Sequence, residues 1–271
     1  MIRRFGFVAL LVLSAVFITG CAAMQIVSAH FASTEHFIFL AEDKRIRYEP
    51  GAEKFAALVK PSLDRAIQQV EVKHYLPFSK PVAIFVCNSA QSFARLSGQK
   101  DTIRGGVHPT QGLFLNPVLL GRPETIAPVL THELSHLHLN QRHQMNFVDY
   151  PTWFNEGLAT FVADGSGAEA ASEVEAKQQI ANGKIFPPQE SGSRLSLDQT
   201  GALSVLPNGS HMFYRQSMMF IGFLKQRDEK RFKQFLLDAQ DGEIFSAAFS
   251  RAFGGKVESL QNEFISALKK S

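Results

Sequence analysis

Thr131-His132-Glu133-Leu134-Ser135-His136 is the stretch from which the rest of this 271-residue chain can be interpreted. In a helix, His132 and His136 are four residues apart and lie on one face, with Cβ atoms about 5–6 Å apart. Two imidazoles at that spacing can bind one divalent ion, and Glu133 beside them is placed to accept a proton from a metal-bound water. The stretch therefore predicts a helical metal site that carries its own general base.

The surroundings of this HExxH stretch favour a metal site over an ordinary amphipathic helix with polar residues on its wet face. They predict a largely buried helix over residues 125–141, with Pro128 in its first turn. The apolar residues of that helix include Val129, Leu130, Leu134, Leu137 and Leu139. Two buried histidines and a buried glutamate would be strongly destabilising without partners, and a bound cation would offset that cost.

A second segment, Asn155-Glu156-Gly157, supplies a candidate third ligand in Glu156. Three protein ligands and one water form the usual arrangement of a catalytic zinc site. Imidazole and carboxylate ligands without a thiolate suit Zn²⁺. The prediction is therefore one zinc ion held by His132, His136 and Glu156.

Together with Trp153-Phe154-Asn155-Glu156-Gly157-Leu158-Ala159, the HExxH stretch resembles the gluzincin metallopeptidases. The resemblance is to peptidase MA-like domains and to the catalytic domain of aminopeptidase N-like enzymes, and it covers roughly residues 45–270. In that family the glutamate of the N-E-G turn is the third zinc ligand, which implies this role for Glu156. The segment from Tyr214 to Leu224 is similar to a family helix whose tyrosine stabilises the oxyanion, which implies this role for Tyr214.

The chain also departs from these relatives. It has no G-A-M-E-N-type segment to capture a substrate amino terminus, so aminopeptidase specificity does not transfer. The nearest equivalent is residues 104–108 followed by 113–116, predicted as an edge strand at the cleft. An extended peptide is predicted to pair along the edge formed by residues 113–115. The metzincin pattern is excluded, because Leu139 and Arg142 stand where it requires glycine and histidine.

The N-terminus predicts a targeting segment. Arg3 and Arg4 precede an apolar run over residues 5–18, too short for a comfortable membrane span, and residues 1–20 are predicted to be a signal peptide. Ile18-Thr19-Gly20-Cys21 resembles a bacterial lipoprotein box, which implies that lipid on Cys21 anchors the protein to the membrane. Ala22 resembles the signal for outer-membrane sorting, and so implies a periplasm-facing anchor. The alternative is a signal anchor that stays attached.

Charge and cysteine content limit the kinds of partner and the disulfide bonds that the chain can have. Removal of residues 1–20 takes away two arginines and no acids, so the net charge falls from +3 to +1. No run of lysine and arginine interleaves with aromatics, so the sequence gives no indication of nucleic-acid binding. With Cys21 assigned to lipid, Cys87 has no disulfide partner and is predicted to be a buried small hydrophobe.

The order of elements along the chain predicts an α+β fold. After a tether over residues 21–34, residues 36–40 and 45–48 predict a hairpin, and residues 52–73 a helix that Pro61 should kink or split. Residues 81–87 and 102–116 predict further strands, and the chain is mainly helical from Pro123 onward. The resemblance implies a zincin-like domain over residues 35–271, with a small mixed sheet. Residues 183–209 are predicted to be a long loop.

Four further polar residues are not predicted to bind the metal directly. His138 is turned about 200° from His136 around the helix, and is predicted to lie at the surface or to act only indirectly on the metal. His108 is predicted to be a solvated loop residue, with contact to substrate at the cleft edge as the alternative. Asn155 is predicted to be a helix cap. Thr160 is interpreted either as a hydrogen-bond partner of a zinc ligand or as an ordinary helix residue.

The sequence as a whole predicts a zinc peptidase that hydrolyses peptide bonds of a peptide or protein substrate at the bacterial cell envelope. The alternative is a catalytically silent metallopeptidase-like module that binds a partner in an envelope assembly. The presence of Glu133 argues against that alternative, because a pure binder needs no general base. Substrate identity, endo- or exopeptidase action and oligomeric state do not follow from the sequence.

Overall fold

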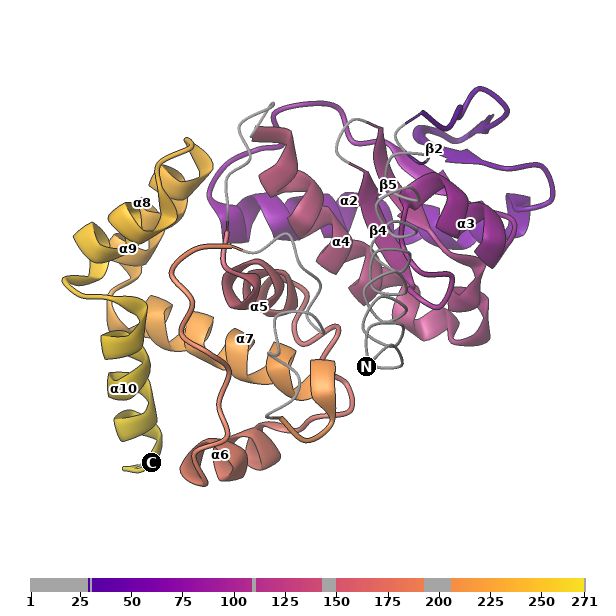
Figure 1. Cartoon of the computed structure of the whole chain (residues 1–271). Helices are drawn as coiled ribbons and strands as arrows, with labels where there is room; N and C mark the ends of the chain where they lie inside the picture. The colour runs from indigo at the N-terminus through magenta and orange to yellow at the C-terminus, as the bar shows by residue number, and fades with distance from the viewer. Residues whose placement is uncertain (1–28, 30, 109–110, 143–149, 193–205, 271) are drawn as a thin grey trace, which may run out of the picture. The chain divides into compact units, whose positions relative to one another are not determined.

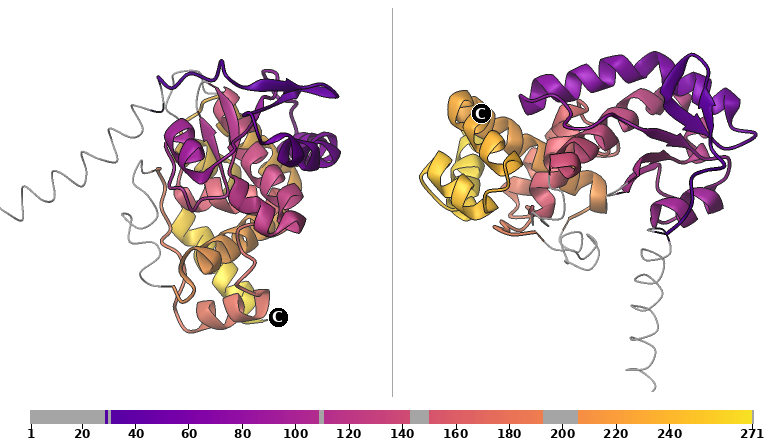
Figure 2. Two further views of the ribbon diagram at one scale, coloured as in Figure 1. Left: turned by 90° about the vertical axis from the view of Figure 1, so that its right-hand side faces the viewer. Right: turned by 90° about the horizontal axis from the view of Figure 1, so that it is seen from above.

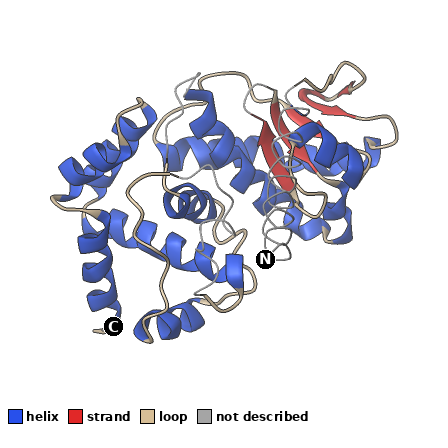
Figure 3. Cartoon of the chain, viewed as in Figure 1, coloured by secondary structure: helices blue, strands red, loops and turns tan. Residues whose placement is uncertain are grey.

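The computed structural model describes residues 29, 31–108, 111–142, 150–192 and 206–270 (Figure 1). It confirms the α+β class, with a five-stranded mixed sheet in the N-terminal part and a mostly helical C-terminal half (Figure 3). The predicted signal peptide, Cys21, most of the tether and residues 193–205 of the predicted long loop lie outside the described residues. In the part that is described, no helix is both long and apolar enough to cross a membrane.

The chain forms two compact units, and the predicted domain over residues 35–271 includes parts of both. The sheet unit comprises residues 1–60 and 82–123, and the helical unit comprises residues 61–81 and 124–271. Helix α2 (Glu53–His74) contributes to both, because Pro61 begins the first segment of the helical unit.

The strand order in the sheet unit is β1-β2-β3-β5-β4. The hairpin of β1 (Ile38–Leu40) and β2 (Asp43–Tyr48) is antiparallel, as predicted. Strand β3 (Ile84–Val86) pairs in parallel with β2 and with β5 (Gly112–Leu115), and β4 (Gly105–His108) is antiparallel to β5. Parallel neighbours need a crossover connection, which α2 supplies between β2 and β3 and α3 (Ala90–Ser97) contributes between β3 and β5.

The predicted position of residues 113–115 at a sheet edge is wrong. Strand β5 lies between β3 and β4 and is paired with both, and the edge strand on that side of the sheet is β4. All four residues of β5 are buried, as expected for an interior strand that is apolar throughout. His108, at the end of β4, is only 4% exposed and packs edge-on to Phe114, so the prediction of a solvated histidine is also wrong.

The core of the sheet unit is aromatic. Strands β3 and β5 contribute stacked rings at a centroid distance of 4.8 Å, and α3 closes over them. The buried cluster consists of Phe37, Phe85, Cys87, Phe93, Leu96 and Phe114. Cys87 is fully buried and free, which confirms its interpretation as a small hydrophobe, and burial raises the pKa of its thiol.

Helix α2 runs unbroken through Pro61, so the predicted split does not occur. A proline in a helix leaves the carbonyl four residues earlier, here that of Ala57, without its N–H partner. Pro61 and Ala57 are both exposed, so water can hydrogen-bond that carbonyl and the helix continues.

The second segment of the helical unit contains α4 (Ile126–Arg142), which begins and ends one residue later than the predicted helix. Helix α5 (Thr152–Val162) packs mainly against α7 (Gly209–Arg227). The other α-helices in the described part of this unit are α6 (Glu173–Ala181), α8 (Glu229–Gln240), α9 (Phe245–Phe253) and α10 (Val257–Leu268). In both views of Figure 2 the orange and yellow helices α7 to α10 pack together.

Trp153 anchors α5 in this unit. Its ring is fully buried among Phe186, Phe220, Phe245 and Phe249, with centroid distances of 5.1 to 6.3 Å. The indole Nε1–H donates to the carbonyl of Gln189 at 2.8 Å, so the buried polar atom is satisfied. Because Trp153 precedes Glu156 by about one helical turn, this packing fixes the position from which Glu156 projects.

Candidate metal centre

Three potential ligands converge in the helical unit. His132 and His136 come from α4 and Glu156 from α5. The two Nε2 atoms are 3.2 Å apart, and Glu156 Oε2 lies 3.4 Å from the first and 3.5 Å from the second. We call these three residues the metal cluster.

The ring hydrogen bonds of the metal cluster determine which nitrogen atoms carry protons. His132 Nδ1 lies 3.2 Å from the Ser166 carbonyl, and His136 Nδ1 lies 3.3 Å from Asn155 Oδ1. Because these oxygens only accept, each Nδ1 carries the hydrogen and each neutral ring presents a bare lone pair on Nε2. Two imidazole lone pairs and a carboxylate oxygen therefore point at one another.

Three acceptors facing one another need a positive charge between them. Burial by itself lowers the pKa of His136, but the Glu156 carboxylate beside it, with a smaller contribution from Glu133, raises that pKa to about 9. Burial likewise raises the pKa of Glu156, but the neighbouring histidines outweigh it and lower the pKa well below its usual range. The cluster thus retains a proton in the absence of a metal, and a divalent cation can replace it.

The ligand spacing also fits the size of a zinc ion. Zinc binds imidazole nitrogen and carboxylate oxygen at ~2.0–2.2 Å in tetrahedral sites, which puts neighbouring ligand atoms ~3.3 Å apart. The separations of 3.2, 3.4 and 3.5 Å agree with that value. The residues present therefore fit a site of two imidazoles and one carboxylate, and Asn155 and Ser166 hold the rings in the ligating orientation.

The role of Asn155 differs from the prediction. Asn155 lies inside α5, whose N-cap residue is Pro151 without a side-chain hydrogen bond, so the predicted helix cap is wrong. Its amide oxygen instead orients His136. Thr160 is fully buried, and its hydroxyl has no hydrogen-bond partner among the described residues, so it bonds to no zinc ligand.

Gly157 allows α5 to approach α7 closely. A Cβ atom at this position would lie 2.8 Å from the backbone carbon of Ser217, closer than real Cβ atoms come. The glycine of the N-E-G segment is therefore needed at a helix crossing, directly after the candidate ligand Glu156. Ser217 is one turn beyond Tyr214, so the same crossing sets the register of Tyr214 on α7.

Tyr214 lies beside the metal cluster. Its ring centroid is 6.0 Å from that of His132, and it packs so closely on Gly167 that a Cβ there would be 2.6 Å from Tyr214 Cδ2. Glu133 is half-buried, and its charge contributes to the raised pKa of His136, which places it near the cluster as well. The structure thus brings together all five predicted site residues, His132, Glu133, His136, Glu156 and Tyr214.

A second group of histidines, not foreseen from the sequence, lies against the other side of α4. His138 is fully buried, so its predicted surface position is wrong. His138 Nε2–H donates to the Leu76 carbonyl at 2.8 Å, His74 Nδ1–H donates to His138 Nδ1 at 3.1 Å, and Ser135 Oγ–H donates to His74 Nε2 at 2.9 Å. We call this series the buried histidine chain.

One signal could have indicated His74. It follows Val70 by four residues on the buried face of α2, and helical spacing therefore predicts that it is buried. Its partner cannot be predicted in this way, because Ser135 and His138 are more than sixty residues away in the sequence.

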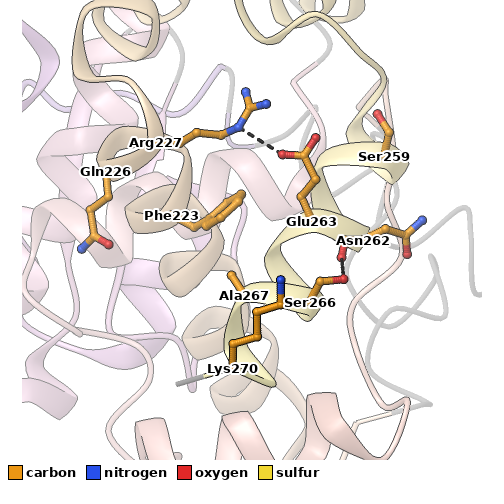
Figure 4. Close-up of a pocket in the computed structure, with 9 residues that line it drawn as sticks. All are labelled: Phe223, Gln226, Arg227, Ser259, Asn262, Glu263, Ser266, Ala267 and Lys270. Carbon is orange, nitrogen blue, oxygen red and sulfur yellow. Dashed lines mark hydrogen bonds and ion pairs between the residues drawn. The ribbon is translucent and has the colours of Figure 1, made fainter.

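An open pocket elsewhere in the helical unit has different chemistry (Figure 4). It lies between α7 and α10, and Arg227 crosses it to pair with Glu263 at 3.1 Å. None of its lining residues belongs to the metal cluster or the buried histidine chain. It is therefore not part of the candidate site.

Comparison of the chain with protein-family models gives no match, and comparison with curated protein sequences gives no match either.

Proposed function

We propose that this protein is a zinc-dependent peptidase of the gluzincin type. The observation that carries the proposal is the convergence of two imidazole Nε2 atoms and one carboxylate oxygen at 3.2 to 3.5 Å. That donor set is the one that catalytic zinc sites of peptidases use, and it leaves a coordination position open.

The residues of the chain have separate roles in the proposed reaction. Zinc bound by the metal cluster would lower the pKa of a water and polarise the scissile carbonyl. Glu133 takes the proton from the attacking water and passes it to the leaving amine. Tyr214 donates a hydrogen bond to the oxyanion, an interaction worth ~3–4 kcal/mol in comparable sites. Asn155 and the Ser166 carbonyl keep both imidazole rings oriented.

The decisive experiment uses Glu133→Gln. The amide cannot accept the proton, so this variant should keep one zinc per chain and lose chelator-sensitive cleavage of an unstructured protein substrate. Glu173→Gln is the matched control, because Glu173 is an exposed residue of α6 that pairs with Lys177 at 3.0 Å. Cleavage at the wild-type rate by Glu133→Gln would remove Glu133 from the mechanism.

The same experiment separates the peptidase from the alternative, a silent module that binds a partner in an envelope assembly. If the protein is such a module, neither the wild type nor any variant should cleave the substrate, whether or not zinc is bound. The presence of Glu133, half-buried and next to His132 on α4, supports the peptidase, because a pure binder needs no general base.

We further propose that lipid on Cys21 anchors the protein at the cell envelope, in the outer membrane and facing the periplasm. The several acyl chains of a bacterial lipoprotein anchor hold firmly, whereas one short chain binds weakly. Cys21→Ser should abolish incorporation of labelled fatty acid and release the protein from membranes. Cys87→Ala, which removes the buried thiol, should still incorporate the labelled fatty acid and remain bound to membranes. Label retained in Cys21→Ser would refute the assignment.

A further inference from the structure

The loop over residues 164–171, directly after α5, is unusually buried. Connecting segments normally run over the surface because their backbone polar groups need water. Here Ser166 is 4% exposed and Ala168 is fully buried. The loop contains the Ser166 carbonyl that accepts the hydrogen bond from His132 Nδ1. Its conformation therefore sets the orientation of one predicted zinc ligand.

The beginning of the loop is fixed by α2. Lys73 Nζ donates to the carbonyls of Phe161 and Val162 at 3.2 and 3.1 Å and pairs with Asp164 Oδ1 at 2.6 Å. Gln69 Nε2 donates to the Val162 carbonyl and to Asp164 Oδ2. These bonds satisfy the last carbonyl groups of α5 and hold Asp164 in its left-handed conformation, with φ at 52°.

The rest of the loop is fixed by Arg215 of α7. Arg215 Nε donates to the Ala171 carbonyl at 2.8 Å, and Nη2 donates to the Ala168 carbonyl at 3.3 Å. The guanidinium also lies against Gly165, where a Cβ would be 3.5 Å from both terminal nitrogens. A planar group with donors in a fixed fork can bridge two carbonyls in this way, whereas a lysine ammonium cannot reproduce the geometry.

We propose that Arg215 is a positioning residue of the metal centre: by bridging the Ala168 and Ala171 carbonyls it holds the Ser166 carbonyl against His132 Nδ1. The inference rests on the proposed function only in requiring that the cluster binds a metal. Without this bridge the loop can shift, and His132 loses the acceptor that keeps its Nε2 lone pair directed at the ion. Loss of such an orienting partner typically weakens metal binding ~10–100-fold.

The test compares Arg215→Lys and Arg215→Ala with the same substitutions at Arg227. Arg227 is on the same helix but pairs with Glu263 at 3.1 Å (Figure 4). It also donates to the Phe253 carbonyl, and neither partner belongs to the loop. Zinc affinity is measured by competition with a chromophoric chelator, and coordination geometry by the visible absorption of bound Co²⁺. Unfolding of each metal-free protein gives the stability change separately.

Both Arg215 variants should bind zinc ~10–100-fold more weakly than the wild type and shift the Co²⁺ bands, while the Arg227 variants match the wild type. Arg215→Lys carries the test if Arg215→Ala does not fold. A lowered unfolding midpoint with unchanged zinc affinity and Co²⁺ spectrum would overturn the proposal. A wild type that binds zinc but cleaves nothing would refute the peptidase and leave the Arg215 comparison intact. A wild type that binds no zinc would refute both.

Discussion

Helix α4 contacts two histidine groups that differ in how their protons are used. In the metal cluster, both Nδ1 atoms donate to outside acceptors, so both Nε2 lone pairs face the Glu156 carboxylate. In the buried histidine chain, each hydrogen-bonding proton has its own acceptor. The Ser135 hydroxyl donates to His74, His74 donates to His138, and His138 donates to the Leu76 carbonyl. The first group needs a cation, and the second is complete without one.

The pKa values follow the same division. The Glu156 carboxylate raises the pKa of His136 to about 9 against the effect of burial. In the chain, burial dominates and lowers the pKa of His138 to about 4 and that of His74 well below its usual range. Two buried histidines therefore do not by themselves make a candidate metal site. The two groups differ in the presence of a carboxylate and in the direction of the ring hydrogen bonds.

The strongest test of this comparison is Glu156→Gln, which removes the charge but keeps the shape of the side chain. Zinc affinity should fall by more than the ~10–100-fold decrease that follows loss of an orienting partner. Hydrolysis should be lost together with the metal. Chelator competition and metal content measure the first effect. If Glu156→Gln kept a full zinc equivalent with wild-type affinity, the carboxylate would not distinguish the two histidine groups.

Tyr214→Phe tests whether the residue beside His132 acts on the reaction or only packs. A phenol hydroxyl helps the transition state more than the bound substrate, so kcat should fall ~10²–10³-fold with little change in KM. Zinc content and stability should remain those of the wild type, because the ring is retained. An unchanged kcat in the fully metallated variant would assign Tyr214 to packing against Gly167.

Gly157→Ala should change both the stability and the metal affinity. Alanine in a helix is normally more stable than glycine, but here its Cβ would meet the Ser217 backbone at 2.8 Å and push α5 from α7. The free energy of unfolding should fall by ~1–3 kcal/mol, and zinc binding should weaken because Glu156 moves with α5.

Gly222→Ala is the matched control for this helix crossing. Its new Cβ would have only Phe161 Cε2 nearby, at an ordinary 3.7 Å, so the substitution should stabilise α7 by ~0.5–1 kcal/mol. Denaturant unfolding of the metal-free proteins measures both changes. Equal effects at the two positions would show that the close crossing does not constrain the site.

The smallest effect concerns acid stability and the buried histidine chain. The pKa of His74 is lowered by burial, then by the charges of His138, His136 and Arg142. The unfolded chain therefore takes up a proton near pH ~6.5 before the folded protein does, and stability falls as the pH drops below that value. The contribution of His136, whose pKa is raised, is instead lost as the pH rises through about 9.

Unfolding of the metal-free protein between pH 7 and 5 measures this linkage, at up to ~1.4 kcal/mol per pH unit for each proton taken up. His74→Gln removes one titrating ring, so its stability should fall less steeply with acid than that of the wild type. An identical slope in the two proteins would mean that His74 is not held neutral by the fold.

The accuracy of the sequence predictions depended on how local each feature is. Helical and strand periods are properties of a few neighbouring residues, so the β1–β2 hairpin and α4 appeared close to their predicted bounds. Strand order is not local. Nothing within residues 113–115 shows that β3 and β4 pair on either side of them, and the edge was therefore assigned to the wrong strand. Pro61 leaves α2 unbroken because the effect of a proline on a helix depends on solvent exposure, which the tertiary structure sets.

For the candidate site, the sequence by itself determined the chemical types and the helical phase of its residues. His132 and His136 share a face because helix geometry places residues four apart together, and the NEG segment indicated Glu156. The tertiary structure alone decided which atoms these side chains meet. The Ser166 carbonyl, Arg215 and His74 come from distant parts of the chain, and they fix tautomers and orientations only once the helices have packed. Proton positions follow from those acceptors, and a spacing pattern carries no information about them.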